Sequence, residues 1–404
     1  MKKYIPIGIF ICSLVLSGCG QKIKEIQVSN MGSALEKSYI DVYIPHKLEA
    51  GKYEPKEGVY VGAYVENNID LDKSMMQYEK KIGKEQAFRV FQYKQSGDLT
   101  AQVLLECIAA KQTPYIKVLG NKDYDLIPIY QMIGDLNTRY NTPIYIELFP
   151  IEDISIDPVE YQKYYKDAYK LIKKYIEDVV IVWSGNWDAV YHLPIYYPGN
   201  DVVDWVGLNV FMPKYKEGKA YKVDVEERID FWYKMFQNDK PMLLSTLAIS
   251  HFSRVDHTYT IEDAKNKLNY FYDILCKTYP RIKGILYGDV DMAHVSSKGM
   301  EDYRLTSQEK LTSHIEELQS KEHFLSEIVK EDSFVSVPVL YKLSAFKIGE
   351  KFYVAEEEAE LLCKNKLMIR TVPTQIDDKG KKYYSLDFIV SRQEGWIEQE
   401  KLEN

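Results

Sequence analysis

The sequence predicts an α/β protein, a (β/α)8 TIM barrel followed by a small β-containing C-terminal module. From Gly58 onward, short apolar runs alternate with segments whose apolar residues recur at helical spacing, and this alternation is typical of a parallel sheet covered by helices. The apolar runs number eight, as a closed parallel barrel requires. An open doubly wound sheet is the alternative. No GxGxxG motif follows the first run, which argues against the dinucleotide-binding version of that sheet.

Each predicted strand is a short, mostly apolar run. In chain order the runs are Val59–Tyr64, Ala87–Tyr93, Pro114–Leu119, Pro143–Phe149, Val179–Trp183, Val202–Val210, Met242–Leu247 and Ile282–Leu286. The predicted helices include Asp72–Ile82, Leu99–Ala110, Pro158–Tyr175 and Ile261–Tyr279, and Ser307–Leu325 is expected to close the barrel. The sixth run follows the turn Pro198-Gly199-Asn200-Asp201 and is apolar almost throughout, which predicts a strand buried on both faces.

Beyond about Asp332 the pattern changes to short β-like runs, which predicts a separate small module over residues 332–404. These runs are Phe334–Leu340, Phe352–Val354, Leu367–Val372 and Tyr383–Val390, with a hairpin-like turn at Lys379-Gly380. The barrel is predicted to span residues 58–325. Residues 20–57 are polar and weakly patterned, as expected for a tether and lead-in.

Residues 1–19 are predicted to be an export signal. Lys2 and Lys3 precede the apolar run Ile5–Leu16, which is too short to span a bilayer and ends in small residues. The ending Leu16-Ser17-Gly18-Cys19 resembles the bacterial lipobox, which implies that Cys19 becomes the lipidated, palmitate-carrying first residue of a lipoprotein. We therefore expect anchoring to the cell membrane, with the body of the protein on the extracytoplasmic face. A plain signal peptide with an incidental cysteine is the alternative.

Composition argues against several classes of function. The 404 residues carry a net charge of −8, which gives no reason to expect a nucleic-acid partner. Once Cys12 and Cys19 are set aside, Cys107, Cys276 and Cys363 lack CxxC spacing, so neither a disulfide framework nor a zinc site is expected. The seven histidines are scattered, and we expect no metal and no cofactor.

Segments of several predicted strands resemble the family 26 glycoside hydrolases, the β-mannanase-like barrels. The main segment is Tyr197-Pro198-Gly199 followed by Val203-Asp204-Trp205-Val206-Gly207-Leu208-Asn209. Further matches are Gly62-Ala63-Tyr64, Val180-Ile181-Val182-Trp183-Ser184, Lys240-Pro241-Met242-Leu243-Leu244 and Asp302-Tyr303-Arg304-Leu305. They follow the family's order over residues 58–325. The resemblance implies a glycosidase-like barrel whose partner is a β-linked polysaccharide or cell-wall glycan.

The resemblance also implies where catalytic carboxylates belong, just past strand four and at the end of strand seven. At the strand-seven position, where the family has a nucleophilic glutamate, this chain has Thr246. A threonine hydroxyl cannot replace that carboxylate without a new activating base. After strand four the family's His-Glu pair is missing. Glu147 takes the place of a family arginine, and Glu152 lies one residue beyond the acid/base position.

Displaced carboxylates are therefore the candidates for catalysis. Alternation along strand four puts Tyr145, Glu147 and Phe149 on one face, which is expected to point into the barrel. Glu152 could serve as an acid if its loop shifts by one residue; otherwise it is a solvated loop carboxylate.

Strand eight offers a further carboxylate. Tyr287 and Asp289 share a face, and Asp291 follows at the end of the strand. Asp289 could form a displaced pair with Glu147 or Glu152, or it could cap the following loop together with Asp291.

Side chains at the ends of strands five, six and eight are candidates for binding sugar by stacking and hydrogen bonding. They are Trp183, Asn186, Trp187, Asn209, Phe211 and Tyr287. Trp183 fits the core equally well. The chain has 34 tyrosines, which suits sugar stacking but is explained as well by compositional bias of the genome.

Two hypotheses on function follow. In the first, the barrel binds a glycan at the cell surface and is catalytically degenerate or atypical. In the second, it is an active extracytoplasmic endo-glycosidase with relocated carboxylates. The C-terminal module, in Ile348–Val354 and Arg370–Pro373, resembles the stalk-type repeats of clostridial surface proteins, which implies a wall-facing binding or spacer role.

Overall fold

The computed structural model describes residues 36–94, 99–119, 125–152, 154–295, 299–329, 334–348, 351–365, 375–376, 380–385 and 396–397. They form two compact units, one within residues 41–341 and 391–397 and the other within residues 36–40 and 342–385. The export signal with Cys19 lies outside the described residues, as do Leu367–Val372, Lys379 and Arg370–Pro373.

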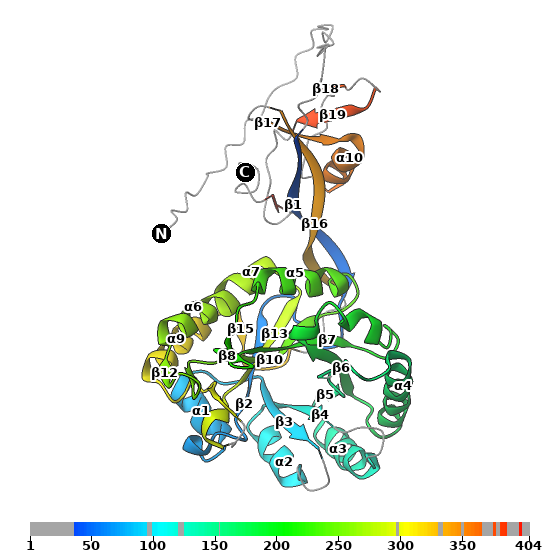
Figure 1. The fold of residues 1–404 in the computed structure, drawn as a ribbon. Helices are drawn as coiled ribbons and strands as arrows, with labels where there is room; N and C mark the ends of the chain where they lie inside the picture. Colours follow the sequence, from blue (N-terminus) through cyan, green and yellow to red (C-terminus); the bar gives the residue numbers. More distant parts are fainter. Residues whose placement is uncertain are drawn as a thin grey trace. The chain divides into compact units, whose positions relative to one another are not determined.

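The larger unit contains a closed barrel of eight parallel strands, which confirms the predicted fold class (Figure 1). The strands are β2 (Val59–Tyr64), β3 (Phe88–Tyr93), β4 (Thr113–Val118), β5 (Ile144–Leu148), β6 (Val179–Asn186), β7 (Trp205–Met212), β10 (Met242–Ile249) and β13 (Ile282–Gly288). They pair in chain order, and β13 pairs with β2 from Gly284 opposite Tyr60 to Gly288 opposite Tyr64, which closes the ring. The short strand β15 (Phe324–Leu325) adds to β2.

Helices surround the strand ring (Figure 1). They are α1 (Met75–Ile82), α2 (Ala101–Ala109), α3 (Ile127–Tyr140), α4 (Pro158–Tyr175), α5 (Val225–Phe236), α6 (Ile261–Asn269), α7 (Leu275–Thr278) and α9 (Glu309–Gln319). A π-helical turn, Tyr270–Ile274, joins α6 to α7. The start of α4 follows from its sequence, because Asp157 accepts a hydrogen bond from the backbone N–H of Glu160 and Pro158 occupies the first turn. No described helix is long and apolar enough to cross a membrane.

Short helices and strands lie in the loops between the main elements. They are η1 (Ile69–Leu71), η2 (Trp187–Ala189), η3 (Leu193–Tyr196), β8 (Tyr215–Lys216), β9 (Lys219–Ala220), β11 (Phe252–Ser253), β12 (Thr258–Tyr259), α8 (Met292–Val295) and β14 (Glu301–Asp302). Strand β7 begins three residues later than predicted, at Trp205. The reason is local: Asp204 turns back and accepts a hydrogen bond from the backbone N–H of Ile181 at 2.8 Å, so Val202 and Val203 belong to the preceding turn.

The two faces of β5 show how the barrel sorts its side chains. Tyr145 belongs to an aromatic cluster with residues from four other strands, which only the barrel interior can bring together: Tyr60, Phe88, Tyr115 and Trp205. Ile144 and Ile146 pack outward in the core beneath the helices. The predicted inward face is confirmed for Tyr145 and Glu147. The predicted inward face is wrong for Phe149, whose φ is 45°. Its ring packs outward against Tyr164 on α4, with 4.7 Å between the two ring centroids.

The smaller unit has its own antiparallel strands. Strand β16 (Phe334–Ile348) contributes its residues from Lys342 onward to this unit and pairs there with β17 (Lys351–Ala355). Strand β17 pairs with β19 (Lys382–Ser385), and β19 also pairs with β18 (Gln375–Ile376). Helix α10 (Glu356–Lys364) follows β17 directly. Val354, Ala359 and Leu362 are fully buried and form part of this unit's core. In the larger unit, Val42 and Tyr43 of β1 (Glu36–Glu49) pair antiparallel with β20 (Trp396–Ile397).

Candidate functional site

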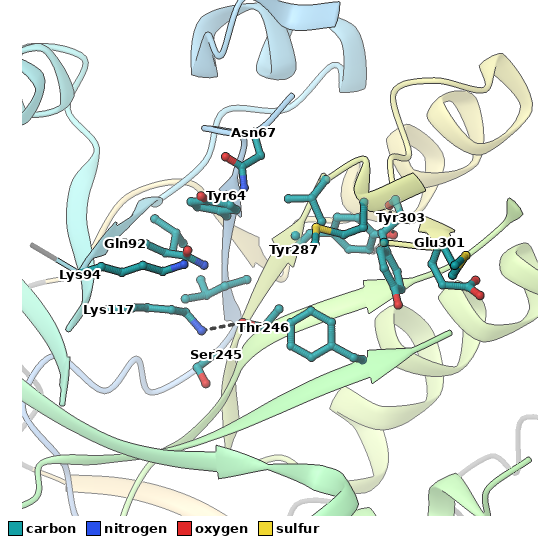
Figure 2. Close-up of a pocket in the computed structure, with 18 residues that line it drawn as sticks. Tyr64, Asn67, Gln92, Lys94, Lys117, Ser245, Thr246, Tyr287, Glu301 and Tyr303 are labelled. Carbon is teal, nitrogen blue, oxygen red and sulfur yellow. Dashed lines mark hydrogen bonds between the residues drawn. The ribbon is translucent and has the colours of Figure 1, made fainter. Parts of the chain in front are cut away.

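A cavity of about 440 Å³ opens at the C-terminal ends of the barrel strands (Figure 2). This is the end at which barrel enzymes carry their sites, and the volume is typical of a small-molecule site. Its lining comes from β2, β3, β4, β7, β10 and β13 and from the segment 299–303. Aromatic side chains supply much of the wall: Tyr64, Phe211, Tyr287 and Tyr303.

A lysine lies at the floor of the cavity. The Lys117 ammonium, from β4, donates to Thr246 Oγ1 at 2.5 Å (Figure 2). It also donates to Asn209 Oδ1 at 2.8 Å. It also lies 3.1 Å from Oε2 of Glu147, and the two side chains are only 6% and 0% exposed. An ammonium has three N–H donors; two of them are used by Thr246 and Asn209, and the contact with Glu147 Oε2, which accepts no hydrogen bond in the structure, is an ion pair.

Glu147 lies beneath the cavity, behind Lys117. Its Oε1 accepts hydrogen bonds from Ser184 Oγ and, at 3.2 Å, from Asn209 Nδ2. Its Oε2 faces the Lys117 ammonium. Glu147 does not line the cavity. A buried carboxylate that is hydrogen-bonded through one oxygen and ion-paired through the other is a structural counter-ion for Lys117 and is not placed to attack a sugar.

Glu301 is the single acid among the described residues that line the cavity. Its oxygens accept the backbone N–H groups of Lys214 and Tyr215 at 3.0 and 3.3 Å and the Ser250 hydroxyl at 2.5 Å. In Figure 2 it lies across the cavity from Lys94 and Lys117. The carboxylate therefore serves to fix the loops around it.

Glu152 lies outside the lining, in the loop after β5. Its residue is exposed, yet neighbouring atoms desolvate the carboxyl group and raise its pKa, while Lys117 and a hydrogen bond from Asn186 Nδ2 at 3.3 Å oppose that rise. Glu147 also raises the pKa of Glu152 electrostatically. The structure thus brings Glu152 and Asn186 together beyond the C-terminal ends of β5 and β6, outside the cavity lining.

Asp289 is fully buried and does not line the cavity, although Gly288 and Val290 on either side of it do. It accepts from Asn68 Nδ2, Thr306 Oγ1 and the backbone N–H of Leu305, each at 2.6 Å. Burial raises its pKa, and these hydrogen bonds oppose the rise. Tyr287 does line the cavity, and its hydroxyl donates to the backbone oxygen of Tyr303 at 2.8 Å.

The other predicted sugar-binding residues divide into two groups. Phe211 lines the cavity, and its ring meets that of Tyr303 edge-on. Asn209 lies below, in the network around Lys117. Trp183 and Trp187 are both 0% exposed. Trp183 packs edge-on against Tyr197, and the Trp187 indole N–H donates to the Phe211 backbone oxygen, so neither ring is available for stacking on a sugar.

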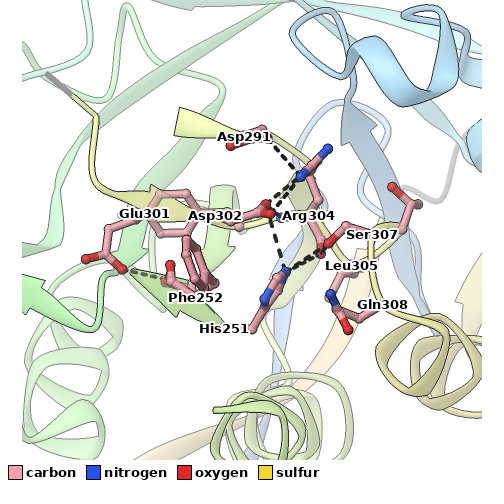
Figure 3. Close-up of polar contacts among 12 residues, drawn as sticks. His251, Phe252, Asp291, Glu301, Asp302, Arg304, Leu305, Ser307 and Gln308 are labelled. Atoms are coloured by element: carbon pink, nitrogen blue, oxygen red, sulfur yellow. Dashed lines mark hydrogen bonds and ion pairs between the residues drawn. The ribbon is translucent and has the colours of Figure 1, made fainter. Parts of the chain in front are cut away.

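Asp291, His294 and Asp302 form a cluster beside the cavity. Their potential ligand atoms lie within 4.8 Å of one another. Figure 3 shows Asp291 and Asp302 of this cluster around Arg304. Arg304 contacts carboxylate oxygens of both Asp291 and Asp302 at 2.8 Å. A cation from the chain itself therefore already balances these acids, and the donor set does not fit a metal ion better than it fits Arg304.

Sequence reasoning missed Lys117, Lys94 and Glu301. For Lys117 a signal was present: it is a lone lysine in the apolar run Pro114–Leu119, and alternation places it on the same face as Tyr115. A charged residue on the inward face of a barrel strand needs a buried partner. The equivalent position of the next strand is Glu147, which β4–β5 pairing places opposite Lys117.

The chain resembles solved structures of glycoside hydrolase barrels, as the sequence resemblance predicts. A family GH26 β-mannanase from Bacteroides ovatus has 11% identity and a TM-score of 0.47, covering 69% of this chain and 92% of that one. A GH26 protein from a Muricauda species has 12% identity and a TM-score of 0.49, covering 68% and 91%. The catalytic domain of a Bacillus GH26 endo-β-1,4-mannanase has 12% identity and a TM-score of 0.45, covering 66% and 87%. At these identities the likeness concerns the fold alone. No protein-family model and no curated protein matches the chain.

Proposed function

We propose that the barrel binds a segment of polysaccharide in the cavity at its C-terminal end and does not carry out ordinary retaining hydrolysis. The size of the cavity, about 440 Å³, supports a sugar ligand. So do the aromatic faces of Tyr64, Phe211 and Tyr303 in its wall, because aromatic rings combine apolar area with polar tips.

The observation that carries the proposal is the position of the Lys117 ammonium. A retaining glycosidase needs two carboxyl groups about 5 Å apart on the two sides of the scissile bond. Here the floor of the cavity holds an ammonium against Thr246, and the Glu147 carboxylate behind it is buried and ion-paired with that ammonium.

An active glycosidase with relocated carboxylates is the second candidate, and Glu152 favours it. A raised pKa suits a general acid. Glu152 would still need a carboxylate partner with access to the sugar, and Glu147 is buried, ion-paired with Lys117 and absent from the lining. We therefore rank this candidate below binding.

Binding and turnover are measured separately to test the proposal. The full chain, with Cys19→Ser to keep it in solution, is titrated with oligosaccharides from mannans, glucans and xylans, and reducing ends are assayed in parallel. We expect binding that weakens in Phe211→Ala and is unchanged in Tyr140→Ala, an exposed ring at the end of α3. Turnover abolished by Glu152→Gln, but kept in the exposed control Glu177→Gln, would establish the second candidate instead.

We propose further that the protein works as a lipoprotein on the extracytoplasmic face of the cell membrane, held by a lipid on Cys19. The motif Leu16-Ser17-Gly18-Cys19 after an apolar run supports this. The smaller C-terminal unit would then act as a spacer or a wall-binding element between the membrane and the glycan.

A further inference from the structure

We infer that the sugar bound in the cavity is acidic, a β-linked glycan that carries carboxylate groups. The inference rests on the proposed glycan-binding function and adds the chemical class of the ligand. It comes from the distribution of charge around the cavity and from the direction in which one hydroxyl group must donate.

Cationic side chains predominate in the lining. Lys94 and Lys117 enter the cavity from neighbouring strands, Lys94 directly after β3 and Lys117 from β4 (Figure 2). Lys117 lines the cavity whereas its counter-ion Glu147 does not, so the positive end of the buried pair faces the ligand. Glu301, the acid of the described lining, lies on the opposite side with its oxygens engaged by Lys214, Tyr215 and Ser250.

Thr246 adds a directed donor at the cavity floor. Its oxygen accepts a hydrogen bond from the Lys117 ammonium at 2.5 Å. The hydroxyl proton must therefore point away from Lys117, and Thr246 itself lines the cavity. An ammonium that donates to a hydroxyl polarises its O–H bond. A polarised O–H beside a fixed positive charge is a strong donor to a carboxylate.

Together these groups match an anion better than a neutral sugar. A carboxylate placed over Thr246 accepts the Thr246 proton and lies in the field of Lys117 and Lys94. A neutral hydroxymethyl group at the same place gains neither the charge-assisted hydrogen bond from Thr246 nor the attraction to the two lysines. The aromatic walls serve both ligands equally, because stacking on Phe211 or Tyr303 does not depend on the charge of the sugar.

The experiment compares two matched oligosaccharides by calorimetry with the full chain carrying Cys19→Ser. β-1,4-linked mannuronate tetramers and β-1,4-linked mannose tetramers differ only in a carboxylate or a hydroxymethyl group at carbon six. We expect the acidic tetramer to bind about tenfold or more tightly, as one charge-assisted hydrogen bond allows. The preference should shrink as salt is raised from low to about 0.5 M, because salt screens the lysines.

Three variants test whether the preference for the acidic tetramer arises in the cavity. Thr246→Val keeps the shape of the side chain and removes the donor, and Lys94→Met removes an exposed charge; each should reduce the preference for the acidic tetramer. Lys80→Met, an exposed lysine on α1 outside the lining, is the control and should leave it unchanged.

Each of the other possible results contradicts a specific part of the inference. Equal binding of the two tetramers overturns the acidic ligand and leaves the proposed glycan-binding function standing. A preference that survives both Thr246→Val and Lys94→Met overturns the assignment to this cavity. Absence of binding by either tetramer, together with absence of binding by the glucan and xylan series, overturns the inference and the proposed function together.

Discussion

The ammonium nitrogen of Lys117 and the carboxylate of Glu147 form an ion pair at 3.1 Å inside the barrel, on neighbouring strands β4 and β5. Both side chains are buried, so each charge depends on the other for compensation. Breaking such a pair by removing one partner costs about 3–5 kcal/mol, because a buried charge is left uncompensated.

We expect Lys117→Met to lower the free energy of unfolding by roughly that amount, about 3–5 kcal/mol. The double variant Lys117→Met/Glu147→Gln should lose less than the sum of the two single variants, since it leaves no isolated charge. Urea unfolding followed by circular dichroism measures all three. Additive losses would show that the two side chains are not coupled.

Asp289 is expected to matter for stability more than for chemistry. It accepts hydrogen bonds from Asn68, Leu305 and Thr306, and an asparagine would turn an N–H₂ group toward donors that need an acceptor. Asp289→Asn should therefore lower the free energy of unfolding by about 1–3 kcal/mol. Glycan binding measured below the unfolding transition should be unchanged. A variant of wild-type stability that has lost binding or turnover would instead place Asp289 in the functional site.

The sequence predicted the barrel because its signals are local. A buried parallel strand is a short apolar run, so strand β2 is predicted with its bounds and strand β13 as far as Leu286, two residues before its end at Gly288. Helix α4 was predicted with its bounds because Asp157 and Pro158 mark its start. Strand β7 was placed early because the hydrogen bond from Ile181 to Asp204 is a long-range contact that no local pattern records.

The site was harder to predict because its residues meet only after the barrel closes. Glu147 was correctly placed inside the barrel, but its partner Lys117 comes from another strand, and the lining residue Glu301 comes from far along the chain. Trp183 shows the converse difficulty. It is the last residue of the predicted strand Val179–Trp183, which would place it at the mouth of the barrel. Strand β6 instead runs on to Asn186, and the Trp183 ring packs against Tyr197 in the core, since the residue type alone does not tell a stacking platform from a core residue.

The proposed lipid anchor makes a direct prediction about location. Replacing Cys19 with Ser removes the thiol that would carry the lipid, so the protein should move from the membrane fraction to the soluble fraction. Cys12→Ser, in the apolar run of the same signal, is the control and should keep the protein in the membrane fraction. Cell fractionation with immunodetection measures how each variant divides between the membrane and soluble fractions. Unchanged membrane retention of the Cys19 variant would rule out this mode of anchoring.

His251 gives the larger unit a predicted dependence on pH. Its side chain is 0% exposed, its Nε2 donates to the backbone oxygen of Arg304 at 2.9 Å, and its Nδ1 has no hydrogen-bond partner in the structure (Figure 3). Burial lowers the pKa of His251, although Asp302 opposes the shift. The folded protein thus binds the proton less readily than the unfolded chain, in which histidine titrates near pH ~6.5.

The free energy of unfolding should therefore fall as pH drops below about 6.5, and the fall should end below the lowered folded pKa of His251. One proton contributes a slope of at most about 1.4 kcal/mol per pH unit. His251→Gln preserves a donor to the Arg304 oxygen and cannot titrate, so it should flatten this slope. His323→Gln is the comparison, because burial also lowers the pKa of His323, which should account for a separate part of the slope. Urea unfolding at a series of pH values from 5 to 8 measures the slope of the free energy of unfolding against pH. A slope identical in wild type and His251→Gln would show that His251 does not cause this pH dependence.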